Sequence, residues 1–156
     1  MTSKTLKNIR ICCFVALAFC LVWAISMVAN FIVNVFGKTV HPIDWSQNTF
    51  MKVVVVFCYV VGTIAMIGIC VKVAFNILKG LRENMAFPRN NERLMFWASL
   101  VDFVRLFGTA NLAKLWDDSL VLLIAPENFI TPFLLLFFAF MYKVAADAVE
   151  ENSLTV

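Results

Sequence analysis

The chain has 156 residues, of which 62% are apolar and 15% are charged, and its formal net charge is +3. A soluble domain has roughly 45–50% apolar and about a quarter charged residues, so this excess of apolar residues exceeds what one small core can bury. The basic residues flank apolar runs and form no basic face, which argues against direct binding to nucleic acid. The composition therefore predicts an integral membrane protein.

The first apolar segment, residues 11–36, has no charged residue over 26 positions. A helix of this length, at ~1.5 Å per residue, spans the ~30 Å hydrocarbon core of a bilayer. Ala24-Ile25-Ser26 resembles a signal-peptidase site, but the apolar run continues ten residues beyond it. This continuation favours a retained signal anchor over a cleaved signal peptide.

Three further segments complete the pattern, and we predict transmembrane helices at residues 51–78, 94–112 and 129–148. The third is interrupted by Asp102 and Arg105, and the fourth is rich in phenylalanine. We therefore predict one all-α membrane domain over residues 1–156, a four-transmembrane-helix bundle.

The connecting segments differ in length and character. Residues 37–50 and 109–128 are predicted as outer loops, the second with an interfacial element on the outer surface. Residues 79–93 are predicted as a cytoplasmic loop, in which Asn90 or Asn91 is the expected N-cap of the third helix. Residues 147–156 are predicted as a cytoplasmic tail that extends the fourth helix.

The distribution of basic residues predicts the orientation, because cytoplasmic segments of membrane proteins carry an excess of lysine and arginine. One side of the predicted membrane has nine of them: Lys4, Lys7, Arg10, Lys72, Lys79, Arg82, Arg89, Arg93 and Lys143. The other side has three: Lys38, Lys52 and Lys114. We therefore expect both the N-terminus and the C-terminus to be cytoplasmic, as four crossings require.

Asp102 and Arg105 are predicted near the middle of the membrane. A charged side chain there costs roughly 2.5–3.5 kcal/mol even on the lenient insertion scale. Residues at i and i+3 share a helix face, so the two can form an ion pair that points into the bundle. The pair has two interpretations: a neutralised pair that fixes one packing arrangement, or a ligand or proton site.

Charged residues also gather at the predicted cytoplasmic side. The basic residues Lys79, Arg82, Arg89 and Arg93 belong to the loop, and Glu150 and Glu151 belong to the tail. We expect the acidic tail to dock on the basic loop, where a protein partner would also bind. The alternative is that the basic residues face the anionic inner leaflet of the membrane.

We find no motif of a catalytic, cofactor-binding or metal-binding site in the sequence. The five cysteines lie in or beside apolar runs without a CxxC pair, and the single histidine, His41, lies alone in a predicted outer loop. A zinc site needs about four converging ligands. We therefore predict a protein that is not an enzyme and has no cofactor.

Two short motifs resemble a known family. Residues 79–94 contain Lys79-Gly80, Phe87 and Asn90-Asn91-Glu92-Arg93-Leu94, similar to a linker of the YoaS-like family of bacterial inner-membrane proteins. The ending, residues 150–156, resembles that family's acidic terminus. Ala86 and Ser153 depart from its pattern. The resemblance implies four transmembrane helices, a bacterial plasma membrane and genes next to small helix-turn-helix regulators, but no catalytic residues.

The favoured hypothesis is a sensory or partner-binding module of the bacterial envelope, with the lipid bilayer and a cytosolic protein as its partners. Linkage to a small helix-turn-helix regulator is one form of it. The alternatives are a small transporter or channel subunit that uses Asp102 and Arg105, and a membrane protein that gives immunity to a toxin. The sequence leaves the oligomeric state open.

Overall fold

The computed structural model describes residues 3–36, 43, 45–82, 88–116, 121–124 and 126–154. His41, Phe87 and residues 37–42 and 44 of the predicted outer loop at 37–50 lie outside these residues. The described residues form four α-helices and one short 3₁₀ helix, and none of them lies in a β-strand. In chain order the elements are α1 (Ser3–Phe36), α2 (Thr49–Arg82), α3 (Asn90–Asn111), η1 (Leu112–Trp116) and α4 (Glu127–Leu154).

Three of the helices are long and apolar enough to cross a membrane. The qualifying stretches are Lys4–Ala29 in α1, Thr49–Arg82 in α2 and Asn128–Glu151 in α4. Helix α3 does not qualify by composition, because Asp102, Arg105 and several other polar residues dilute its apolar residues. The described part of the chain is therefore all-helical, with four α-helices of which three are suited to cross a membrane.

The beginning of α3 corrects one expectation. Its N-cap is Arg89, which makes no side-chain capping hydrogen bond, so the prediction of Asn90 or Asn91 as the cap is wrong. Asn91 is instead fully buried, because its amide forms hydrogen bonds to the neighbouring helices. In the predicted interfacial element after α3, the described residues include the short 3₁₀ helix η1 and the irregular residues 121–124.

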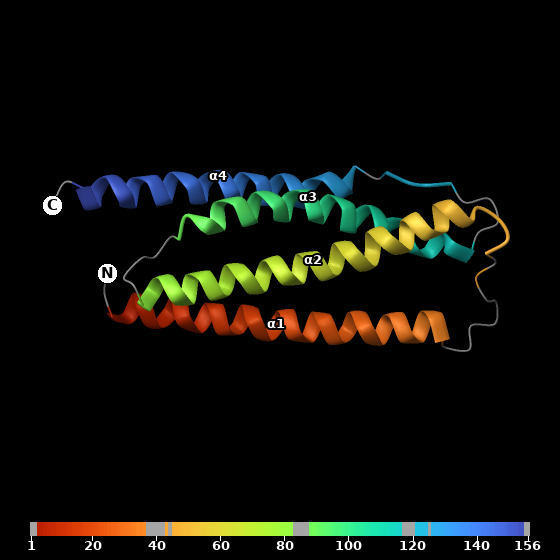
Figure 1. The fold of residues 1–156 in the computed structure, drawn as a ribbon, viewed down its shortest axis with the longest axis horizontal. Coiled ribbons are helices and arrows are strands. Elements are labelled where there is room, and N and C mark those ends of the chain that lie inside the picture. Colours follow the sequence, from red (N-terminus) through yellow and green to blue (C-terminus); the bar gives the residue numbers. More distant parts are fainter. Residues whose placement is uncertain are drawn as a thin grey trace.

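The four helices lie in chain order, each antiparallel to the next, with both termini at one end (Figure 1). Helix α2 contacts α1 and α3, and α3 contacts α4. Among the described residues, no close backbone contact joins α1 to α3 or α4. The predicted bundle is therefore an open one: among the described residues, α1 makes close backbone contact with α2 alone, and α3 lies between α2 and α4.

Helices α2 and α3 approach so closely that two positions admit only glycine. A Cβ atom at Gly108 would lie 2.8 Å from the Cα of Tyr59, and one at Gly62 would lie 2.9 Å from the Cα of Arg105. Small residues allow such backbone approach in membranes, where helices gain little from the hydrophobic effect. These two glycines therefore mark a close backbone contact between α2 and α3.

The first prediction concerns this contact. We expect Gly108→Ala and Gly62→Ala each to destabilise the protein by about 1–3 kcal/mol, because backbone atoms must move to admit the added methyl group. The matched control is Gly68→Ala, since a Cβ at this exposed glycine of α2 has no neighbour within 4 Å. Thermal unfolding of the purified proteins in detergent measures the difference. Equal midpoints for all three variants would contradict the close packing.

Candidate functional site

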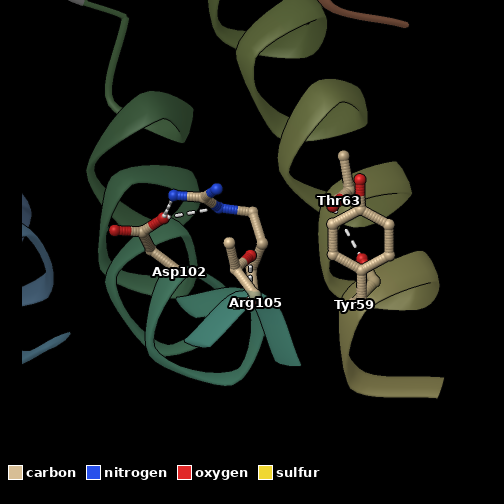
Figure 2. A network of polar contacts seen from close by, with 5 residues as sticks. Tyr59, Thr63, Asp102 and Arg105 are labelled. Atoms are coloured by element: carbon tan, nitrogen blue, oxygen red, sulfur yellow. Dashed lines mark hydrogen bonds and ion pairs between the residues drawn. The ribbon is translucent and has the colours of Figure 1, made fainter. Parts of the chain in front are cut away.

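Asp102 and Arg105 form an ion pair on one face of α3. The Nε and Nη2 atoms of Arg105 donate hydrogen bonds of 2.9 and 2.7 Å to Oδ1 of Asp102. Asp102 is 1% exposed, and the side chain of Arg105 is 19% exposed. Figure 2 shows the guanidinium folded back toward Asp102, with Tyr59 and Thr63 on the neighbouring helix α2. The pair is therefore enclosed by protein.

Two neighbouring helices, α2 and α1, contact the arginine. Gly62 of α2 faces the backbone of Arg105, and the lack of a side chain there lets the two helices meet. From α1, the indole ring of Trp23 lies 5.3 Å from the guanidinium carbon, a distance suited to a cation–π interaction. Sequence reasoning did not identify Trp23 in this role, because a tryptophan within an apolar helix is as readily explained by contact with lipid.

The second carboxylate oxygen of Asp102 has no hydrogen-bond partner among the residues that the structure describes. Oδ2 is buried and accepts no hydrogen bond from any described residue, and it points away from Arg105 (Figure 2). A buried acceptor of this kind can take a proton, a water molecule or a donor group of a ligand. This oxygen is the one chemically available group that we identify at the ion pair.

The described residues do not gather metal ligands. Within them, no group of three or more His, Cys, Asp or Glu side chains lies close enough to hold a metal ion. The five cysteines are free thiols. The described part of the chain therefore offers an ion pair and hydrogen-bonding groups.

A second polar cluster, which sequence reasoning missed, joins three helices near the termini. The Asn76 amide of α2 donates a 2.8 Å hydrogen bond to Oδ1 of Asn91 in α3. The Asn91 amide in turn donates to the hydroxyl of Tyr142 in α4, at 3.4 Å. That hydroxyl donates to the carbonyl of Pro88, at 3.2 Å. The sequence shows Asn76, Asn91 and Tyr142 as polar residues within helical stretches. Their spacing along the chain does not indicate that their side chains contact one another.

A third polar contact lies at the opposite end of α3. The fully buried Asn111 side chain pairs with the backbone of Leu123. Its Oδ1 accepts from the Leu123 N–H at 2.7 Å, and its Nδ2 donates to the Leu123 carbonyl at 2.9 Å. This contact holds residues 121–124 against α3. At the same end the structure also buries Lys52 fully, although the charge count had treated it as an outer topology residue.

The charged residues predicted for the cytoplasmic side lie at the end of the fold that holds both termini (Figure 1). Nη2 of Arg89 lies 3.2 Å from Oδ1 of Asp147 and 3.1 Å from Oε2 of Glu150. These carboxylates, Asp147 first, raise the pKa of Arg89 above its ordinary value, so the residue remains cationic. The loop and the end of α4 are therefore joined through Arg89.

The other predicted residues of this group are exposed at the same end: Lys79, Arg82, Arg93 and Glu151. Among the described residues, no ion pair joins Arg82 or Arg93 to the tail. A further pair links α3 to α4, with Nζ of Lys143 3.8 Å from Oε1 of Glu92. The structure thus brings Arg89 and Glu150 together and leaves Arg82 and Arg93 facing outward.

Comparisons with protein-family models, curated proteins and solved structures found no match for this chain. They carry no argument for or against the YoaS-like resemblance, which remains a prediction. Function is therefore inferred from the geometry of the two charged clusters and from the exposed surface.

The second prediction tests the buried ion pair. We expect Asp102→Leu to destabilise the protein by about 3–5 kcal/mol, because it leaves the arginine unpaired in an enclosed site. The double variant Asp102→Leu/Arg105→Met removes both charges, so it should recover most of that loss. Thermal unfolding in detergent is the measurement. A double variant less stable than Asp102→Leu alone would show that the pair is not the reason for the loss.

Proposed function

We propose that this chain is a non-enzymatic protein of the bacterial inner membrane that crosses the bilayer four times and binds a cytosolic protein partner. Both termini and the basic loop lie in the cytoplasm. The partner implied by the YoaS-like resemblance is a small helix-turn-helix regulator. The proposal has three parts: the fourth crossing, the orientation and the partner.

The exposed surface of α3 supports the fourth crossing. The side chains that α3 exposes over its middle are apolar: Phe96, Trp97, Leu100 and Val104. Its polar residues Ser99 and Asp102 are buried against the neighbouring helices. A helix of 22 residues is ~33 Å long, which matches the ~30 Å hydrocarbon core. By this distribution, α3 presents an apolar surface to lipid and keeps its charges inside.

The distribution of basic residues supports the orientation. The N-terminal part of α1, the end of α2 and the beginning of α3 lie at one end of the fold (Figure 1). This end carries Lys4, Lys79, Arg82, Arg89 and Arg93. An excess of basic residues next to the membrane marks the cytoplasmic side.

The third prediction concerns the membrane topology, which is the number of crossings and the side of the membrane on which each terminus lies. Reporters active only outside the cytoplasm, fused singly after Val156 and within residues 37–50, distinguish four crossings from three. We expect an inactive C-terminal fusion and an active fusion at 37–50, because four crossings return the chain to the cytoplasm. A fusion to the N-terminus with a cytoplasmic reporter serves as the control. If the two termini were found on opposite sides, α3 would not cross.

The observation that carries partner binding is the charged end of the fold. Helix α2 has 34 residues and α4 has 28, so they are ~51 and ~42 Å long and exceed the hydrocarbon core. Their ends therefore extend beyond the lipid. There the Arg89 side chain is 65% exposed and holds two acidic residues of α4. Basic and acidic side chains are thus exposed together at ordered helix ends. Such a surface is suited to binding a protein partner.

A small transporter or channel subunit is the second candidate function. It is favoured by Oδ2 of Asp102, a buried carboxylate oxygen without a partner among the described residues. Membrane-buried acidic groups mark ion or proton paths in many transporters. Against it, one acidic residue with its countercharge gives no continuous path.

The fourth prediction tests the partner. A photo-crosslinking amino acid placed at Arg82 in the full-length protein, in native membranes, should capture a cytosolic protein. The same probe at Gln47, at the opposite end, is the control and should not capture it. Charge reversal of Glu150 and Glu151 should reduce the yield severalfold, because it changes the acidic part of the surface. Equal capture at both positions, or none at Arg82, would contradict the proposal and favour the transporter.

A further inference from the structure

A pocket of about 290 Å³ lies between α3 and α4 near the end that holds the termini. Its floor is apolar, formed by residues that include Ala139 and Phe140 of α4 and Trp97 of α3. Its rim is charged, with Arg93 and Glu92 from α3 and Lys143 from α4. An apolar floor below a charged rim fits a ligand with one charged end and one hydrocarbon end. It is separate from the contacts of Arg89 and from the Asp102–Arg105 pair.

The depth of the pocket matches the level of lipid phosphates. Arg93 precedes Asp102 by nine residues, so it lies ~13 Å along the helix axis toward the termini. If α3 crosses the bilayer with Asp102 near its middle, Arg93 lies close to the edge of the ~30 Å hydrocarbon core. Trp97 is 57% exposed one turn deeper, where tryptophan side chains are enriched in membrane proteins.

The charge of the rim selects among lipids. Lys143 lies 3.8 Å from Glu92, so these two charges largely cancel. Among the described residues, no ion pair or hydrogen bond involves the side chain of Arg93. The rim therefore has a net charge of +1, which complements a headgroup of net charge −1. An arginine suits phosphate oxygens because its guanidinium can donate two parallel hydrogen bonds.

We propose that this pocket binds an anionic phospholipid, with the phosphate at Arg93 and Lys143 and the beginning of one acyl chain on Ala139 and Phe140. The volume is near the lower end of ligand pockets, roughly 300–1,000 Å³, so it holds the headgroup and upper chain and not the whole lipid. The inference rests on the proposed crossing of α3, since only then does the pocket open toward lipid.

The test uses the full-length protein reconstituted in phosphatidylcholine vesicles that contain a minor fraction of phosphatidylglycerol. Bromine atoms are placed on the acyl chains of one lipid at a time, and quenching of tryptophan fluorescence is measured. The difference between the protein and its Trp97→Phe variant isolates quenching at the pocket. The ratio of quenching by the two lipids gives the preference for phosphatidylglycerol at Trp97.

We expect a severalfold preference for phosphatidylglycerol. Arg93→Gln should reduce it about fivefold, since one basic residue near an anionic surface contributes ~1 kcal/mol. Glu92→Gln should raise it, because it leaves Lys143 unopposed. The matched control is Arg10→Gln, an exposed arginine of α1 outside the pocket, which should leave the preference unchanged.

The contrary outcomes separate the two proposals. Equal quenching of Trp97 by both lipids, or equal effects of Arg93→Gln and Arg10→Gln, overturns the lipid site while the crossing of α3 stands. Absence of quenching of Trp97 by either lipid overturns both. The opposite effects expected for Arg93→Gln and Glu92→Gln distinguish a lipid site from a loss of folding, which would lower the preference in both variants.

Discussion

The enclosure of the Asp102–Arg105 pair is the constraint on which the rest of the structure depends. Neither side chain is tolerated against lipid, where an uncompensated charge is costly. Helix α3 must therefore turn this face toward protein, and it does so between α2 and α4. Among the described residues, helix α1 makes no close backbone contact with α3 or α4, but its Trp23 lies over the guanidinium of Arg105. The open arrangement of the helices follows from where these charges are hidden.

Polar contacts occur at three levels along α3, and together they fix its position. Asn91 joins α2 and α4 near the termini, Asp102 and Arg105 pair in the middle, and Asn111 holds the segment at Leu123 at the far end. Helices in a bilayer gain little from apolar association, so hydrogen bonds and close packing determine which faces meet. Gly62 and Gly108 allow the backbones to approach at the side where these contacts form.

The charged end of the fold combines two proposed uses that differ in their chemistry. Arg89 lies outside the helices' apolar stretches and joins the loop to α4, where a protein partner can contact it. Arg93, one turn further along α3, lies at the rim of an amphipathic pocket, which the proposed crossing of α3 places at the level of the lipid headgroups. In these two proposals, the same excess of basic residues that predicts orientation divides into a surface beyond the lipid and a site within its interface.

The sequence by itself determined the number and approximate position of the helices and the membrane character, because long uncharged runs have one low-energy solution in lipid. It also indicated that Asp102 and Arg105 can pair, since three residues along a helix place them on one face. The tertiary structure alone decided that, among the described residues, α1 makes close backbone contact only with α2, and that Asn91 joins three helices instead of capping one. It also decided that Trp23 lies over Arg105 and that α3 and α4 enclose a pocket. These features depend on the rotation and spacing of whole helices, which are set by contacts between residues far apart in the chain.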